Sequence, residues 1–224
     1  MNEAQTGHIQ SCSGTYHLKN DNSFGLSSIV RMLLRSHRHD IAGRVQALWG
    51  SVELLDSPSP DLPEEIIVAI HILEDLVNAW RGELLVLDQL LDGSLEITCI
   101  TSSQIREALP SDTILPETYW YCDLEGLYAS IRHAYKTVGR TGYRHLQMNV
   151  EAENHLVIEI IAGEAGVSAL DCENELSTKQ SVAEVFAGDI DAAFAEAHAY
   201  YGGFSISGYY TNSGAGIRLV ICPA

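Results

Sequence analysis

The chain has 224 residues, of which 46% are hydrophobic, so it is long and apolar enough to bury a folded core. Thirteen Lys and Arg residues against 30 Asp and Glu give a net charge of −17, which argues against nucleic acid or an anionic membrane as its main partner. Its five cysteines form no CxxC pair, and the sequence contains no apolar run of membrane-spanning length. Because the first residues also lack an apolar signal segment, we expect a cytoplasmic protein with free thiols.

The first part of the chain predicts a helical hairpin. Residues 1–22 are polar, and we expect them to form a flexible N-terminus. Within residues 23–93, apolar side chains recur at spacings of three and four along two stretches separated by the proline-rich segment DSPSPDLPEE. Two long amphipathic helices joined by a short loop form an antiparallel hairpin, and we expect a homodimer to close it into a four-helix bundle.

The remainder of the chain, residues 94–224, predicts an α/β sandwich built as a second domain. Helices are expected at about 123–138 and 189–201, with a short one within 101–110. Strands are expected at 119–122, 145–151, 156–162, 204–210 and 217–222. We expect a mixed sheet and a linker near residues 93–101, and the fold class is therefore α+β.

The most informative residue of the first helix is His39, which we predict to be an exposed catalytic group. His37 falls on the apolar stripe, and His39 lies about 200° further round the helix, so it points away from the hairpin core. Asp40 adjoins it, and three arginines lie close in sequence: Arg35, Arg38 and Arg44. An exposed imidazole can carry a phosphoryl group, a carboxylate can orient the ring, and guanidinium groups can offset phosphoryl charge. The alternative for His39 is an ordinary surface histidine on a solvated face. His37, in contrast, is interpreted as a structural histidine at the core edge.

The segment RHDIAGRVQALWGSVELL resembles the dimerisation and histidine-phosphotransfer helix of two-component signalling proteins. It is most similar to the type R-H-D-x-x-x-[KR]-[LV]-Q of the sporulation phosphorelay phosphotransferase and of citrate- and dicarboxylate-sensing kinases. The matching residues are Arg38, His39, Asp40, Arg44, Val45, Gln46 and Gly50. The resemblance implies that His39 accepts the phosphoryl group. Kinases that also act as phosphatases often carry Asn or Thr four residues later, where this chain has Gly43, so the resemblance does not extend to phosphatase activity.

The second domain resembles the ATP-binding domain that follows this hairpin in histidine kinases. DLEGLYASIRHAYKTVG resembles the helix of the Asn box, VIEIIAGEAGV the strand before the Asp-x-Gly-x-Gly loop, and YGGFSISGYYTNSGAGIRLVICP the last two strands. His133 stands where the family has the magnesium-binding Asn, and Ala162 where it has the adenine-binding Asp. The glycine-rich positions read Glu164, Gly166 and Gly188-Asp189-Ile190. These departures remove contacts that ATP needs, so we expect neither ATP binding nor autophosphorylation.

The function expected from these residues is phosphotransfer between the aspartates of response-regulator receiver domains. His39 and Asp40 are the predicted catalytic residues, and the predicted phosphoryl-binding or partner-binding residues are Arg35, Arg38 and Arg44. The chain would need no metal or cofactor of its own, since the receiver supplies the magnesium ion. The alternatives are a pseudokinase adaptor that binds a kinase or receiver without phosphotransfer, and an active kinase with a divergent nucleotide site.

Overall fold

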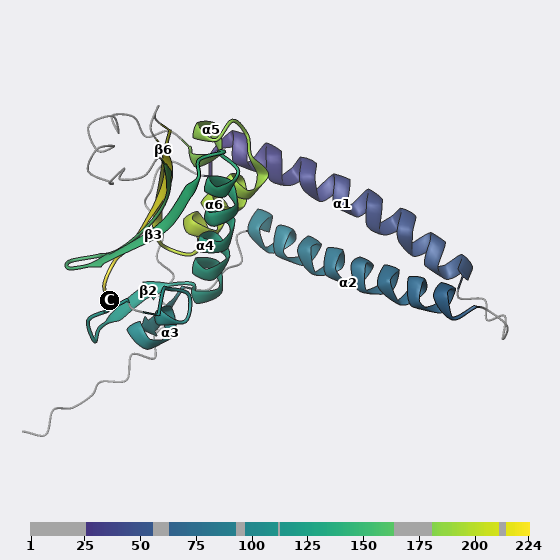
Figure 1. The fold of residues 1–224 in the computed structure, drawn as a ribbon, viewed down its shortest axis with the longest axis horizontal. Coiled ribbons are helices and arrows are strands. Elements are labelled where there is room, and N and C mark those ends of the chain that lie inside the picture. Colours follow the sequence, from purple (N-terminus) through teal and green to yellow (C-terminus); the bar gives the residue numbers. More distant parts are fainter. Residues whose placement is uncertain (1–25, 56–62, 93–96, 112, 164–180, 211–213) are drawn as a thin grey trace, which may run out of the picture.

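The structure is a computed structural model that describes residues 26–55, 63–92, 97–111, 113–163, 181–210 and 214–224. It has the expected α+β fold, in which a long helical hairpin precedes an α/β sandwich (Figure 1). The predicted flexible N-terminus and most of the proline-rich loop lie outside the described residues, as do Glu164 and Gly166.

The hairpin consists of α1 (Ser28–Leu55) and α2 (Glu64–Asp92), which run side by side away from the sandwich (Figure 1). Val52 of α1 and Val77 of α2 are buried, as their places on the apolar stripes predict. Leu34 is completely buried, whereas its neighbour Leu33 is only half-buried. The first half of α1 also packs against the sandwich, and this second contact draws Leu34 into the core. None of the helices among the described residues is long and apolar enough to cross a membrane.

The main sheet has four strands in the order β3-β4-β6-β5, and every pairing in it is antiparallel. The strands are β3 (His145–Ala152), β4 (Leu156–Gly163), β5 (Ser205–Tyr210) and β6 (Gly214–Ile221). The expectation of a mixed sheet was therefore wrong. Only three residues separate β3 from β4, and three separate β5 from β6. Connections this short join antiparallel neighbours, because a parallel pair needs a long crossover.

A separate two-stranded sheet precedes it, formed by β1 (Thr98–Thr101) and β2 (Tyr119–Cys122). The expectation of a linker was wrong for residues 98–101, which pair along the whole of β2. Between these strands, the short helix α3 (Ser102–Arg106) begins with a capping box in which Thr101 and Gln104 satisfy each other's backbone N–H groups. The indole of the buried Trp120 donates a hydrogen bond to the Ser102 hydroxyl at 2.9 Å, which ties β2 to α3.

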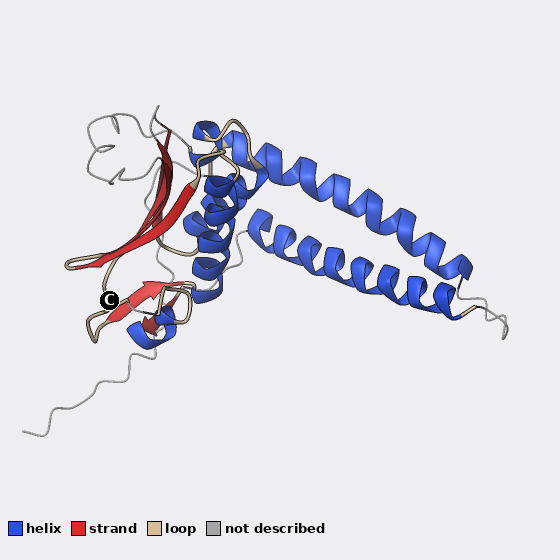
Figure 2. Ribbon diagram, viewed as in Figure 1, coloured by secondary structure: helices blue, strands red, loops and turns tan. Residues whose placement is uncertain are grey.

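Three helices cover one face of the four-stranded sheet: α4 (Leu124–Gly139), α5 (Val182–Val185) and α6 (Ile190–Tyr201) (Figure 2). The sandwich core lies between these helices and the sheet, where Leu127, Ile158, Ile160, Ile217 and Leu219 are fully buried. The side chain of Asp123 caps α4 by accepting from the Gly126 backbone N–H at 2.8 Å. The helix layer therefore has a fixed position on the sheet.

A second hydrophobic core joins the hairpin to the sandwich. Val30 and Leu34 of α1, together with Leu87 and Leu90 of α2, pack against Phe194 of α6. The alanine-rich sequence of α6 leaves room for a helix on either side, so α6 contacts α4 on one flank and α1 on the other. His39 lies on the exposed side of α1, away from this core.

Candidate functional site

His39 stands on the outer surface of α1, as its position on the helix predicts. Its side chain is 91% exposed, and that of Asp40 is 64% exposed. The Nδ1 atom of His39 lies 4.0 Å from Oδ1 of Asp40, which is an electrostatic contact rather than a hydrogen bond. A proton on Nδ1 faces the carboxylate in this arrangement, and Nε2 then presents its lone pair to solvent.

The three predicted arginines occupy different positions around His39. Arg35 lies one helical turn before His39 on the same face, and both Arg35 and Arg44 are exposed. Arg38 donates from Nε to Oδ1 of Asp88 on α2 at 2.5 Å. This hydrogen bond raises the pKa of Arg38, so the guanidinium group stays protonated. Arg38 therefore connects the two helices beside His39.

The surface on the C-terminal side of His39 is open. Gly43 follows His39 by one helical turn, and a Cβ atom placed there would have no other atom within 4 Å. A docking protein would therefore meet no side chain at position 43. The same absence of a side chain means that Gly43 offers no polar group to orient a water molecule.

His37 belongs to a different environment, because it faces the sandwich. Its Nε2 donates to Oε1 of Glu83 on α2 at 2.8 Å, and its ring meets Phe194 edge-on with centroids 5.7 Å apart. The prediction of a histidine at the core edge is confirmed. Its partners lie on α2 and α6, which sequence spacing alone could not reveal.

His133, at the expected magnesium-ligand position, connects α4 to α6. Its Nδ1 donates to Oδ1 of Asp191 at 2.6 Å, and its ring stacks on Phe194 with centroids 4.8 Å apart. Burial lowers the pKa of His133 and outweighs the opposing effect of Asp191. Burial alone would raise the pKa of Asp191, but the bonds from His133 and Arg140 lower it. His133 is thus a neutral donor to an ionised carboxylate.

Asp189, at the middle of the expected Gly-x-Gly position, fixes the start of α6. Its Oδ1 accepts from the Ala192 backbone N–H and from the Thr137 hydroxyl, both at 3.0 Å. Its Oδ2 accepts from Arg140, the C-cap residue of α4, at 3.1 Å. The preceding Gly188 has φ +80°, a conformation that favours glycine. These bonds place α6 directly on α4, where the hydroxyl of Ser130 donates to the Ala195 carbonyl at 2.7 Å.

Sequence reasoning missed His198, which lies on the same face of α6 as Asp191 and Phe194. It is 5% exposed, and neither of its ring nitrogens has a hydrogen-bond partner among the described residues. Burial, assisted by the charge of Arg132 and by that of His133 when His133 is protonated, lowers the pKa of His198 to about 4. The available signal was the helical spacing of residues 191, 194 and 198, which aligns an Asp, an aromatic ring and a His.

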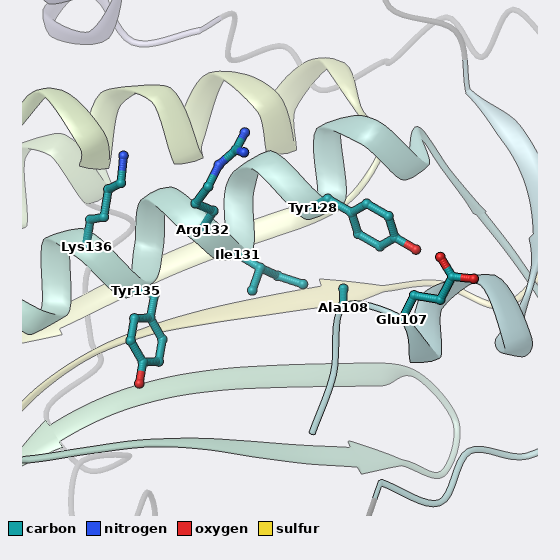
Figure 3. A pocket seen from close by; sticks show the side chains of 7 residues that line it. All are labelled: Glu107, Ala108, Tyr128, Ile131, Arg132, Tyr135 and Lys136. Atoms are coloured by element: carbon teal, nitrogen blue, oxygen red, sulfur yellow. The ribbon is translucent and has the colours of Figure 1, made fainter. Parts of the chain in front are cut away.

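A hollow of about 420 Å³ lies between α4 and the residues that follow α3 (Figure 3). Tyr128 and Tyr135 line it, and the Tyr128 hydroxyl donates to the Gln104 carbonyl at 2.5 Å. Figure 3 shows Arg132 and Lys136 extending from the side of α4 opposite to Tyr135. Within the described residues, no cluster of three His, Cys, Asp or Glu side chains could hold a metal ion.

Comparisons with known proteins find likeness in structure only. No protein-family model matches the chain, and no curated protein matches it. The chain is similar to the histidine kinase AdeS of Acinetobacter baumannii, with 14% identity over 82% of this chain and 97% of that one and a TM-score of 0.49. It is also similar to full-length ShkA in complex with AMPPNP, with 12% identity over 85% of this chain and 46% of that one and a TM-score of 0.47.

The chain is also similar to the solved structure of a bacterial phosphotransferase. It has 13% identity over 88% of this chain and 98% of that one, with a TM-score of 0.34. Identities and TM-scores this low do not show that the chain shares the activity of any of the three proteins. The function proposed next rests on this chain's own residues.

Proposed function

We propose that this chain is a histidine phosphotransferase of a two-component phosphorelay, which passes a phosphoryl group between receiver domains through His39. The observation that carries the proposal is the exposed pair of His39 and Asp40, at 4.0 Å, within a cluster of arginines on a helix of an otherwise acidic protein. The arginines attract the acidic, phosphorylated face of a receiver, and the open surface at Gly43 admits it.

The transfer step uses Nε2 of His39 as the nucleophile. Its lone pair attacks the phosphorus of a receiver's aspartyl phosphate, the N–P bond forms, and the P–O bond to the aspartate breaks. The leaving aspartate keeps the electron pair as a carboxylate, with magnesium supplied by the receiver. Asp40 stabilises the positive charge that develops on the ring through the Nδ1 proton, and Arg35 offsets phosphoryl charge. The reverse of this step delivers the group to a second receiver.

We propose that the chain does this without binding ATP. Asp189 and Asp191 bind α6 to α4, and the buried ring of Phe194 packs beside His133. The Nδ1 atom of His133 already donates a hydrogen bond to Asp191. A histidine at this position would also offer magnesium a nitrogen ligand in place of the oxygen of Asn, and magnesium prefers oxygen ligands. The described residues also place two carboxylates at the start of α6, where a triphosphate would be repelled.

We further propose that two copies associate through the hairpin. The side chains of Val68, Ile72, Leu76 and Val86 form a second apolar stripe along α2, and each is exposed. A stripe of this length is unusual on a monomer and fits a second copy in a four-helix bundle. We expect the dimer to act in the cytoplasm, where free thiols such as those of Cys122 and Cys222 persist.

A phosphotransfer assay tests the proposal. Receiver domains charged with labelled phosphate are mixed with the protein and with its His39→Ala variant, and label on the chain is measured. We expect label on the wild type and none on the variant. His71→Ala is the matched control and should keep the label, since His71 is also an exposed histidine beside a carboxylate, Glu74 at 3.1 Å. Receiver binding without label on either protein would favour the adaptor function instead.

A further inference from the structure

Strand β3 forms one edge of the four-stranded sheet. It pairs with β4 on one side, and no other strand among the described residues pairs with it. None of the residues of β3 is buried, whereas seven of the eight residues of β4 are. In Figure 1, the turn that joins these two strands projects away from the helix layer. The outer side of β3 therefore presents backbone N–H and C=O groups that could pair with a further strand.

This edge is long and regular. All eight residues of β3 pair with β4 in one continuous register, without a bulge. The strand contains no proline and no lysine, the residues with which proteins commonly block a free edge. The even-numbered side chains pack against the sandwich core: Leu146, Met148, Val150 and Ala152. The odd-numbered side chains point to the opposite face, so the strand alternates between apolar and polar residues along its whole length.

The charges along β3 favour an antiparallel copy of the same strand as its partner. Arg144 and His145 make the start of the strand basic, and Glu151 and Glu153 make its end acidic. All four of these residues are exposed. A second β3 running antiparallel places the basic start of each strand beside the acidic end of the other, whereas a parallel copy would place like charges together.

An antiparallel pair centred on Met148 matches the side chains on both faces of the sheet. His145 of each copy then lies opposite Glu151 of the other, where the imidazole can donate a hydrogen bond to the carboxylate. Between these two pairs, the amide side chains of the strand face each other, and on the core side apolar side chains meet apolar ones. A slip of one residue would place polar side chains opposite apolar ones.

We propose that β3 is a self-association edge, through which two copies of the chain join their four-stranded sheets into one continuous antiparallel sheet. This contact is separate from the apolar stripe of α2, and it rests neither on phosphotransfer nor on the hairpin dimer. A single strand edge is a small contact, and interfaces that bury less than about 1,200 Å² are typically weak. At low micromolar concentration the hairpin contact alone therefore determines the mass of the protein, and pairing through β3 adds to it as the concentration rises.

Sedimentation equilibrium of the full chain, from about 5 to about 500 μM, tests the proposal, because weak association follows mass action. We expect the mass to double from that of the species present at the lowest concentration. Amide hydrogen exchange gives a second readout on the same samples. Every second backbone N–H of β3 points to the free edge, and these amides should gain protection only at high concentration.

Exchanging the charges across the pair makes the test specific. His145→Glu places two carboxylates opposite each other, and Glu151→Lys places an ammonium group opposite the imidazole, twice in each symmetric contact. Each substitution should weaken self-association about tenfold, whereas the double variant pairs Glu with Lys and should restore it. Glu184→Lys is the matched control, because it makes the same change of net charge at an exposed position of α5, which packs near the opposite edge strand β5. It should leave self-association unchanged.

A mass that stays constant up to the highest concentration would overturn the proposal, and so would exchange of the β3 amides that is independent of concentration. Single variants that associate as strongly as the wild type, or a double variant as weak as the single ones, would also overturn it. The first two outcomes are read on the wild type, so the test remains decisive even if a variant fails to fold.

Discussion

His39 and His71 show how much the surroundings of an exposed histidine matter. Both are highly exposed, and both lie within 4.0 Å of a carboxylate. His71 lies on α2, and its Nδ1 atom is hydrogen-bonded to the carboxylate of Glu74. His39 has its carboxylate at a looser distance, has Arg35 and Arg38 beside it, and has an open surface at Gly43. These differences single out His39 as the proposed phosphoryl acceptor.

Asp40→Ala should lower the rate of phosphotransfer about 100-fold while leaving the fold intact, because the carboxylate orients the ring and stabilises its charge in the transition state. The rate is measured by rapid-quench transfer from a phosphorylated receiver. Glu74→Ala removes the equivalent carboxylate beside His71 and should leave the rate unchanged. An unchanged rate in Asp40→Ala would contradict the role assigned to Asp40.

Local periodicity predicted the exposure of His39, and the resemblance of its segment to phosphotransfer helices pointed to it as the phosphoryl acceptor. The partners of neighbouring residues were not predictable in this way. Arg38 bonds to Asp88, 50 residues away, and His37 bonds to Glu83, 46 residues away. Such pairs depend on how two helices align, and apolar spacing does not determine that register.

Within the secondary-structure elements, Gly43 is a glycine in the middle of α1, at a position where the helix does not need one. Gly43→Ala should increase the free energy of unfolding by about 0.5–1 kcal/mol, since alanine loses less backbone entropy in a helix and its Cβ would meet no atom. Gly126→Ala is the opposite case, because its Cβ would collide with the Asp123 side chain that caps α4. Urea unfolding measures both changes, and a destabilised Gly43→Ala would contradict this description of the helix surface.

The helices and most strands were predictable from local patterns, whereas their pairing was not. The apolar runs of β4 and β6 identify them as strands, and the short connections make β3–β4 and β5–β6 antiparallel. The antiparallel pairing of β4 with β6, which are far apart in sequence, follows from neither pattern. Strand β1 has four residues, of which one is buried, so its pattern is too short to distinguish it from a linker. It becomes a strand because β2 is available to pair with it.

At the scale of the whole molecule, the buried His198 makes stability depend on pH. Its pKa is about 4 in the folded protein and 6.5 in the unfolded chain, so the unfolded state binds the proton more readily. This contribution to stability is complete above pH 6.5 and is lost as the pH falls toward 4, by on the order of 3 kcal/mol. Denaturant unfolding between pH 7 and 4 measures the loss. His198→Phe should reduce it, and an identical pH profile in that variant would contradict the assignment.

The proposed dimer is testable on the apolar stripe of α2. Ile72→Glu should convert the dimer to a monomer, because Ile72 is 61% exposed in the single chain and a carboxylate would be buried at the interface. Ile114→Glu is the control, since Ile114 is 92% exposed in the sandwich and outside the stripe. Analytical ultracentrifugation gives the mass of each. A wild-type monomer, or an Ile72→Glu dimer, would contradict the proposed four-helix bundle.

We propose that His39 accepts a phosphoryl group from a receiver and not from ATP. The most direct measurement incubates the purified protein with a phosphorylated receiver or with labelled ATP, and locates the modified residue by mass spectrometry under conditions that preserve phosphohistidine. We expect phosphate on the His39 imidazole after incubation with the receiver and none after incubation with ATP. Label from ATP alone, or phosphate on His37 in place of His39, would contradict it.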